Sequence, residues 1–309
     1  MSRKKVTVVG AGNVGATCAQ LLALKGWADV VLVDIIKGVP QGKSLDMMQC
    51  RAVTHVDGKV TGANTYAPTR DSDVVVITAG IPRKPGMSRD DLIKINTDIV
   101  KNVTLEIKKT SPKAILIVVS NPLDAMVYVA AKVSKFPPRK VMGMAGVLDT
   151  SRYRLFLAEE LGCSAQDITA MVLGGHGDTM VPLVRFTSMA GIPVSDLLPQ
   201  DKIAAIVERT KNGGGEIVKL LGTGSAYYAP ATAVVEMVES LILDRKRVLP
   251  CAAYLNGEYG VKGLYVGVPC VLGSKGVEKV VEIKLDPEEK KIFKNSVEHV
   301  AKLVKSIKV

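Results

Sequence analysis

The chain has 309 residues, 47% of them hydrophobic and 23% charged, which suits one large or two ordinary folded domains. No apolar run is long enough to span a bilayer and no secretory signal is apparent, so a cytoplasmic protein without membrane attachment is expected. The five cysteines are scattered without a C-x-x-C pair, which argues against a disulfide framework and a zinc site. The net charge of +11 admits nucleic-acid binding, but the lysines are dispersed without interleaved aromatic residues. A basic solvated surface, which can also steer small anions, is therefore favoured.

The first predicted element is a buried strand at residues 6–9 that runs directly into a glycine-rich turn. The turn reads Gly10-Ala-Gly12-Asn-Val-Gly15, and apolar residues at helical spacing follow it. Gly10 permits the turn, Gly12 allows the backbone to approach a pyrophosphate, and Gly15 lets the helix pack on the strand. This strand, turn and helix predict a dinucleotide site made of Gly10, Ala11, Gly12, Asn13, Val14 and Gly15.

A second buried strand at 30–33 ends in Asp34, about twenty residues beyond the glycines. A carboxylate there accepts hydrogen bonds from ribose hydroxyls and repels a 2′-phosphate, so NAD is the predicted cofactor. Residues 41–52 are predicted to form a helix whose apolar stripe contains Leu45, Met48 and Ala52. Residues 60–66 give a short, polar strand suited to a sheet edge.

Two further buried strands, at 73–77 and 114–119, end in the polar sequences Thr78-Ala-Gly80 and Ser120-Asn121. Ligands bind at such carboxyl ends in parallel sheets. The intervening segment 81–89 is broken by prolines and a glycine, so it is predicted to be a lid above the site. A long helix follows over 90–109, with Ile95, Ile99 and Val103 on one face.

Alternation of apolar strands with helices predicts an α/β fold with a doubly wound parallel sheet of the Rossmann type. The pattern changes near residue 145, after a helix at 125–133 and a strand near 141. We therefore expect a dinucleotide domain at 1–145 and an α+β substrate domain with antiparallel strands at 146–309. Its predicted strands are 168–173, 248–255 and 264–272, and its predicted helices are 150–161, 202–209, 230–243 and 287–305.

One histidine stands out among three. His55 and His299 have polar neighbours and are predicted to lie on the surface. His176 lies in the turn Gly174-Gly-His-Gly-Asp178, where an ordinary turn residue and a general acid–base residue are both open interpretations. Asp149 is its candidate partner, although a helix N-cap would explain Asp149 equally well.

Three arginines are the other candidates for substrate contact. Arg152 lies three residues after Asp149, and Arg83 and Arg89 lie on the predicted lid. Each alone is most simply a solvated surface residue. Together they can surround one cleft, where a guanidinium group holds a carboxylate through two hydrogen bonds.

Seven motifs in order resemble the lactate/malate dehydrogenase superfamily over essentially the whole chain, and most closely its malate dehydrogenases of the lactate-dehydrogenase-like type. They are Gly10-Ala-Gly-Asn-Val-Gly15, Asp34, Thr78-Ala-Gly80, the segment 81–92, Val119-Ser-Asn-Pro122, Leu148-Asp-Thr-Ser-Arg152 and Gly174-Gly-His-Gly-Asp178. The resemblance implies an NAD-dependent oxidoreductase of the tricarboxylic acid cycle that works as a homodimer or homotetramer.

The resemblance also implies a role for each matching residue. His176 would accept the proton of the substrate hydroxyl, and Asp149 would orient it and support its protonated form. Arg152 would hold the substrate carboxylate, Arg89 would polarise the carbonyl, and Asn121 would contact substrate and cofactor. The remaining implied cofactor contacts are Thr78, Ala79, Gly80, Asn96, Val119 and Ser120.

Two positions bear on the choice of substrate. Lactate dehydrogenases carry Gln where this chain has Arg83, and tend to carry Thr where it has Gly224. The resemblance therefore implies a dicarboxylate substrate and reversible oxidation of (S)-malate to oxaloacetate. Lactate dehydrogenase, a non-catalytic NAD-sensing protein and a basic nucleic-acid-binding protein are the alternatives.

Overall fold

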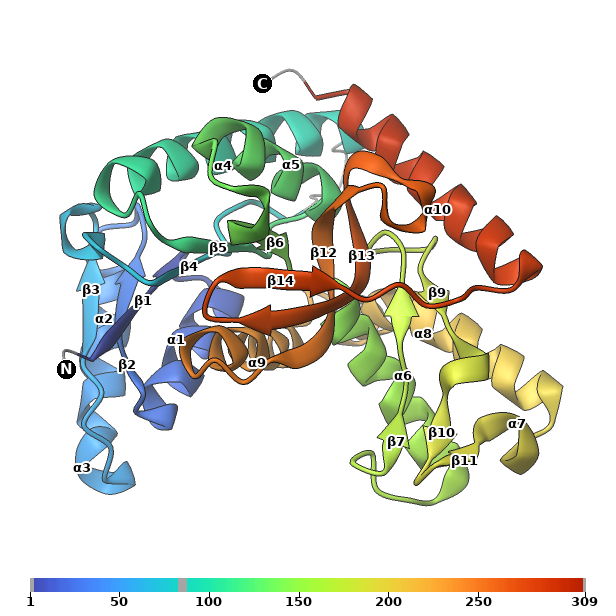
Figure 1. Ribbon diagram of the computed structural model, residues 1–309. Coiled ribbons are helices and arrows are strands. Elements are labelled where there is room, and N and C mark those ends of the chain that lie inside the picture. Colours follow the sequence, from blue (N-terminus) through green and yellow to red (C-terminus); the bar gives the residue numbers. More distant parts are fainter. Residues whose placement is uncertain (1–2, 83–87, 308–309) are drawn as a thin grey trace.

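The computed structural model describes residues 3–82 and 88–307, which are built around one mixed sheet (Figure 1). In chain order its strands are β1 (Lys4–Val9), β2 (Ala28–Val33), β3 (Val60–Ala63), β4 (Val74–Ile77), β5 (Ile115–Val118), β6 (Val141–Gly143), β12 (Arg247–Asn256), β13 (Lys262–Gly273) and β14 (Gly276–Val280). Their spatial order is β14-β13-β12-β6-β5-β4-β1-β2-β3. The pairs from β6 to β3 are parallel, and those from β6 to β14 are antiparallel. The predicted parallel sheet, with β3 at its edge, is confirmed.

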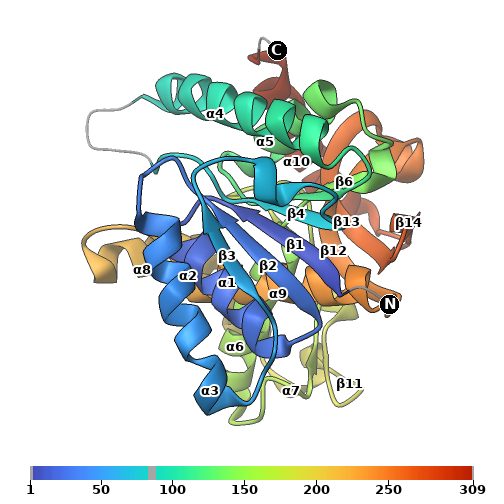
Figure 2. The same cartoon turned by 90° about the vertical axis from the view of Figure 1, so that its left-hand side faces the viewer.

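Helices cover both faces of the sheet. They are α1 (Asn13–Lys25), α2 (Val39–Gln49), α3 (Arg51–Thr54), α4 (Arg89–Thr110), α5 (Leu123–Ser134), α6 (Gly146–Leu161), α7 (Val194–Leu197), α8 (Gln200–Leu221), α9 (Tyr228–Ile242) and α10 (Pro287–Lys305). Figures 1 and 2 show α4, α5 and α10 on one face and α1 and α9 on the other. Alternate side chains of β4 supply the two cores, with Val74 and Val76 on one side and Val75 and Ile77 on the other. None of the described helices is long and apolar enough to cross a membrane.

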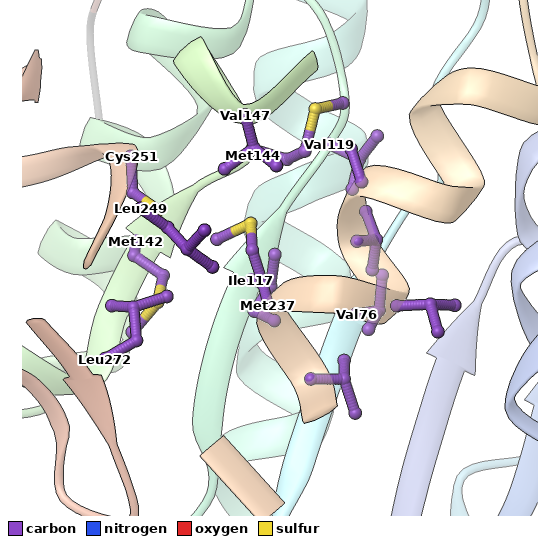
Figure 3. Packing of buried hydrophobic residues seen from close by; sticks show 14 of the residues in the cluster. Val76, Ile117, Val119, Met142, Met144, Val147, Met237, Leu249, Cys251 and Leu272 are labelled. Carbon is purple, nitrogen blue, oxygen red and sulfur yellow. The ribbon is translucent and has the colours of Figure 1, made fainter. Parts of the chain in front are cut away.

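The core on the α1–α9 face continues across residue 145. Val76, Ile117 and Met142 from the parallel strands lie in one cluster with Met237 of α9 and Leu249 of β12 (Figure 3). The sheet is also continuous there, because β6 pairs with β12. The division into domains at residue 145 therefore stays a proposal about two halves that share a sheet and a core.

Several boundaries differ from the sequence-based predictions. The helix predicted at 41–52 is α2 followed by α3, and Leu45 is 63% exposed, so the predicted stripe is wrong. Ile95 of α4 is 37% exposed, because the face toward the sheet buries the polar residues Asn96 and Thr104 along with Val100. An apolar pattern cannot find a buried face that contains polar residues.

The strand predicted at 168–173 is two strands in two small sheets. β7 (Ile168–Thr169) pairs with β10 (Ser188–Met189), which also pairs with β11 (Ile192–Pro193), whereas β8 (Val172–Leu173) pairs with β9 (Val181–Pro182). The run changes partner at its middle, and partner choice is not encoded in local hydrophobicity. The antiparallel β12–β13 pair and the helix α10 are confirmed.

Candidate active site

The turn between β1 and α1 lies at the carboxyl edge of the parallel strands, and its geometry requires glycine at two positions. Gly10 has φ +107°, which residues with a side chain rarely adopt. A Cβ on Gly15 would collide with the carbonyl oxygen of Gly10, so α1 begins directly against the turn. A Cβ on Gly12 would meet nothing within 4 Å, which leaves open space above the turn.

The first turn of α1 fits an anionic ligand. Gly12 caps the helix without any side-chain hydrogen bond, and the first N–H groups of an α-helix have no partner within it. The helix dipole adds partial positive charge at this end. The exposed Gly12 and Asn13 leave these donors accessible, which suits the pyrophosphate of a dinucleotide.

The carboxylate of Asp34 is fixed beside this turn. Its Oδ2 accepts a hydrogen bond from the Ala11 N–H at 2.6 Å, and its Oδ1 accepts one from the Ile36 N–H at 2.9 Å. Carboxylate oxygens have further lone pairs, so ribose hydroxyls can still donate to them. Lys43 of α2 donates from Nζ to the Ala11 carbonyl at 2.7 Å, a contact that no sequence motif indicated.

The remaining strand ends are joined by side-chain hydrogen bonds. Thr78 donates to the Val9 carbonyl at 3.0 Å, and Ser120 donates to the Ala79 carbonyl at 2.6 Å. Asn96 is only 1% exposed, and its amide bonds both backbone groups of Ile81 and the Asn121 carbonyl. Asn96 therefore ties the two loops together, so it shapes the cofactor edge through the backbone of those loops.

Three predicted residues form one hydrogen-bonded cluster. His176 Nδ1 lies 2.8 Å from Asp149 Oδ2, and Arg152 Nη1 donates to Asp149 Oδ1 at 3.2 Å. The side chains of Asp149, Arg152 and His176 are 2%, 13% and 15% exposed. One buried carboxylate therefore holds an imidazole and a guanidinium together.

This pairing decides how the imidazole of His176 can act. A carboxylate only accepts hydrogen bonds, so Nδ1 carries the proton and Nε2 of the neutral ring has a free lone pair. Burial lowers the pKa of His176, but the charge and hydrogen bond of Asp149 and the charge of Asp124 together outweigh burial and raise it. The raised pKa favours the protonated imidazolium, which a carboxylate neighbour stabilises.

Asp149 is not a helix N-cap. The helix α6 begins at Gly146 rather than at the predicted Thr150, and its N-cap is Ala145. Asp149 therefore lies inside the first turn, where its side chain projects toward His176 and Arg152. The N-cap interpretation of Asp149 is therefore wrong, and its carboxylate lies within hydrogen-bond distance of His176.

A second carboxylate at this cluster was missed by the sequence reasoning. Asp124 in the first turn of α5 is 5% exposed, and its Oδ2 accepts the backbone N–H of His176 at 3.0 Å. Its Oδ1 is buried and has no hydrogen-bond partner among the described residues. Burial raises the pKa of Asp124 to about 6, although the charge of His176 opposes this rise.

The turn that carries His176 is held from two sides. Gly174 exchanges backbone hydrogen bonds of 2.8 Å and 3.1 Å with Gly267 of β13. Ser296 of α10 accepts the Gly175 N–H at 2.8 Å. A Cβ on Gly174 would lie 2.6 Å from Ser296 Oγ, so the turn is packed as well as bonded.

Arg152 retains hydrogen-bonding capacity after it contacts Asp149. Its Nε is buried and lacks a partner among the described residues. Three consecutive glycines, 213–215, lie in α8 beside it, and this helix extends well beyond the predicted 202–209. A Cβ on Gly213 would lie 3.1 Å from Arg152 Cδ, so the glycine makes room for the guanidinium stem. A guanidinium with unused donors has the hydrogen-bonding capacity to hold a carboxylate.

The other candidates make no hydrogen bond to this cluster among the described residues, or lie outside the described residues. Arg83 is outside them, and Arg89 begins α4 although its side chain is not described. Asn121 is exposed at the end of β5, and Gly224 is exposed with φ +83°. His55 and His299 are exposed, as predicted.

Sequence models of one family match the chain in two consecutive parts. The model described as lactate/malate dehydrogenase, NAD binding domain, matches residues 4–143, and that described as lactate/malate dehydrogenase, alpha/beta C-terminal domain, matches residues 146–308. The chain belongs to the lactate/malate dehydrogenase family.

This dehydrogenase is similar to malate dehydrogenases over its whole length. It is 58% identical to one from Rhodopirellula baltica, with 99% of this chain and 98% of the relative covered. The structure of malate dehydrogenase from Salinibacter ruber is 54% identical with a TM-score of 0.94, covering 98% and 97% of the two chains.

A lactate dehydrogenase structure from Cryptosporidium parvum, complexed with lactic acid and the cofactor, is 43% identical with a TM-score of 0.96. It covers 99% of this chain and 98% of that one. The backbone therefore does not separate the two activities, whereas sequence identity is higher to the malate dehydrogenases named above. The predicted family, fold class and NAD cofactor are confirmed.

Proposed function

We propose that this dehydrogenase interconverts (S)-malate and oxaloacetate with NAD. The observation that carries the proposal is the buried cluster in which Asp149 bonds both His176 and Arg152. A histidine and an arginine that share one buried carboxylate support the proposal, because oxidation of a 2-hydroxy acid requires a proton acceptor beside a carboxylate-binding cation. The identity of 54–58% to malate dehydrogenases supports malate as the substrate.

In malate oxidation, the unused N–H groups of Arg152 hold the carboxylate next to the hydroxyl carbon. His176 accepts the hydroxyl proton at Nε2 as the carbonyl forms, and Asp149 stabilises the resulting imidazolium. NAD, when bound, provides the acceptor for the hydride. In the reverse direction His176 gives the proton back. Asp124 adds negative charge on the backbone side of the histidine.

The cofactor would lie along the carboxyl edge of the sheet. The turn at 10–15 would receive the pyrophosphate, and Asp34 would accept the ribose hydroxyls. Thr78, Ala79, Gly80, Asn96, Val119, Ser120 and Asn121 would shape the nicotinamide side. Open space at Gly12 and the uncapped α1 support this placement.

Substrate choice is proposed to rest on Arg83 and Arg89. Arg152 can bind one carboxylate of oxaloacetate, and Arg83 would bind the second while Arg89 polarises the carbonyl. The absence of a bulky side chain at Gly224 is consistent with a larger diacid.

We further propose a homodimer or homotetramer in the cytoplasm. Large apolar side chains between residues 35 and 53 are exposed, including Ile35 (90%), Leu45 (63%) and Val53 (79%), which supports burial against a second copy. The five cysteines are free, which suits a reducing compartment. Light scattering would measure the assembly.

The test of function is NADH oxidation with oxaloacetate and with pyruvate, followed by absorbance. We expect a kcat/KM at least about 10²-fold higher for oxaloacetate, because an unpaired buried cation would face pyruvate. Preference for pyruvate would make the protein a lactate dehydrogenase. Turnover of neither substrate would favour a non-catalytic NAD-sensing protein, and salt-sensitive retention on DNA would favour nucleic-acid binding.

A further inference from the structure

Two opposite charges are bonded to one residue of the glycine-rich turn. The Ala11 N–H donates to Asp34 Oδ2 at 2.6 Å, and the Ala11 carbonyl accepts from Lys43 Nζ at 2.7 Å. Neither Asp34 nor Lys43 takes part in any ion pair among the described residues. An ammonium group and a carboxylate therefore bond to the same residue of the turn, and no direct ion pair joins them.

The position of Lys43 is set by the segment that precedes it. Asn64 Nδ2 donates to the carbonyls of Asp34 and Ile36 at 2.7 Å and 2.9 Å, and its Oδ1 accepts from the Gln41 amide at 2.7 Å. A Cβ on Gly62 of β3 would collide with the backbone of Pro40, so α2 packs closely against that strand. The start of α2 is thus held against β3, and Lys43, itself half-buried, is directed at Ala11.

We propose that Lys43 is a second residue that determines cofactor specificity. Its ammonium group would attract the 2′ substituent of the adenosine ribose whose hydroxyls Asp34 would bind. This inference rests on the proposed dinucleotide site. Asp34 favours a 2′-hydroxyl and repels a 2′-phosphate. Lys43 acts in the opposite sense, because its positive charge attracts a 2′-phosphate. Ala11 uses only one of the three N–H donors of Lys43, so the ammonium group can still donate to that phosphate. The strictness of NAD preference is therefore the balance of two charges.

These two opposing charges predict the direction in which each substitution changes the preference for NAD over NADP. Removing Asp34 leaves Lys43 as the sole charge of the pair, so a 2′-phosphate gains an unopposed cation. Removing Lys43 leaves Asp34 unopposed, so discrimination against NADP becomes stricter. A lysine that only braced the Ala11 carbonyl would affect both cofactors alike, because both place the same pyrophosphate on this turn.

The test compares four proteins: the wild type, Asp34→Ser, Lys43→Met and the double variant. The dissociation constants of NADH and NADPH are measured by fluorescence titration, and kcat/KM with oxaloacetate is measured for both cofactors. We expect Asp34→Ser to tighten NADPH binding about ten-fold or more, and the double variant to lose most of that gain, since a charge-assisted hydrogen bond contributes that much.

In the Asp34→Ser background, Lys43→Met should weaken NADPH binding at least about five-fold more than NADH binding. The difference should shrink at high salt, because the interaction is between partly exposed charges. Lys43→Arg should retain NADPH binding in that background. Lys37→Met is the matched control, because Lys37 is exposed on the same connector and should change neither cofactor.

Equal weakening of NADH and NADPH by Lys43→Met would overturn the proposal, as would equal effects of Lys37→Met and Lys43→Met. The titrations do not require turnover. A wild type that binds NADH but reduces neither keto acid would refute the proposed function while Lys43 is still tested by binding. A wild type that binds neither cofactor would refute both proposals.

Discussion

Two regions of the molecule use different kinds of chemical group: the cofactor edge, at the carboxyl ends of the parallel strands, and the catalytic cluster of Asp124, Asp149, Arg152 and His176. The adenosine side of the cofactor edge uses backbone N–H groups of the turn at 10–15, which follows β1, and the charged side chains of Asp34, which follows β2, and Lys43 of α2. The catalytic cluster uses side chains from α5, α6 and the turn after β8, with α8 and α10 packed against them. The glycine turn, Asp34 and Lys43 come from one short stretch of the chain, whereas the catalytic cluster is assembled from distant segments by tertiary structure.

This difference predicts how each region responds to mutation. Backbone donors survive side-chain changes elsewhere, so cofactor binding should be insensitive to the catalytic residues. Asp149 pairs with both His176 and Arg152, so replacing this buried carboxylate should change the position and the electrostatic environment of both side chains. The two regions should therefore separate cleanly in measurements of cofactor affinity and turnover.

The largest effect is expected from His176→Asn. An amide cannot take up the hydroxyl proton, so kcat should fall on the order of 10²–10⁴-fold. The dissociation constant of NADH, measured by fluorescence, should stay within about two-fold because the glycine-rich turn is untouched. Near-normal turnover would make His176 an ordinary turn residue, and a parallel loss of NADH binding would break the separation of the two regions.

Arg83→Gln tests the substrate side of the comparison. Closing the site over pyruvate with Arg83 present would leave a cation unpaired, and removing one partner of a buried charge pair costs roughly 2–5 kcal/mol. The variant should lose oxaloacetate activity and gain pyruvate activity, with little change in NADH affinity. The measurement is the ratio of the two kcat/KM values. An unaltered ratio would mean that Arg83 is a solvated residue and would remove the main physical argument for malate.

The contrast also explains what the sequence predicts well. The glycine spacing, Asp34 and the apolar strands are local patterns with a direct structural meaning, and each is found where expected. The partners of β7, β8 and β12 depend on distant segments, so the split strand and the extension of the parallel sheet were not foreseen.

The same limit applies to the catalytic cluster. Motifs mark His176, Asp149 and Arg152, and the sequence offered Asp149 as the partner of His176, but the hydrogen bond from Arg152 to the same carboxylate became visible only in the fold. Asp124 and Ser296 carry no such signal, because a carboxylate at the start of a helix usually stabilises the helix dipole. The only hint in the sequence was an acidic residue two positions after Pro122. Its burial, which marks it as unusual, cannot be inferred from one sequence.

Asp124→Asn sharpens the electrostatic half of the comparison. The amide oxygen can still accept the His176 N–H, but the charge that raises the pKa of His176 is lost. The alkaline limb of kcat/KM for oxaloacetate should move to lower pH, with a loss of up to about ten-fold above neutrality and less below it. Ser296→Ala removes an uncharged anchor of the same turn and should leave the pH profile in place. Equal profiles for the two variants would reduce Asp124 to a structural anchor.

Raising the pH should lower the activity of Asp124→Asn relative to the wild type but raise its relative folding stability. The pKa of Asp124 is raised to about 6, so the folded state holds its proton more tightly than the unfolded chain. Stability from this group is therefore lost as pH rises from the ordinary carboxyl range through about 6. The free energy of unfolding of Asp124→Asn relative to wild type should increase between pH 5 and pH 8 by on the order of 1 kcal/mol. The cost of placing an amide at this position does not change with pH, so the pH-dependent part of the difference reports the ionisation of Asp124 and its effect on His176. Urea unfolding at the two pH values measures it.

The smallest effects are expected within the glycine run of α8, where one helix has one glycine facing Arg152 and another facing solvent. Gly215 is exposed and a Cβ there would meet nothing within 4 Å, so Gly215→Ala should only improve helix propensity. The gain is about 0.5–1 kcal/mol, a rise in Tm of about 1–3 °C, with KM unchanged.

Gly213→Ala gains the same propensity but places a Cβ 3.1 Å from Arg152 Cδ, tighter than an ordinary contact. The stem must shift by a few tenths of an ångström, which should cancel the gain in Tm. It should also raise KM for oxaloacetate about three- to ten-fold, because a carboxylate clamp depends on its geometry. NADH affinity should be equal in the two variants. If both alanines raise Tm and neither changes KM, the glycines do not make room for Arg152. If instead KM rises only for Gly213→Ala, then α8, which is distant in sequence, sets the geometry of the catalytic cluster. The glycine turn that would bind the cofactor does not depend on α8 in this way.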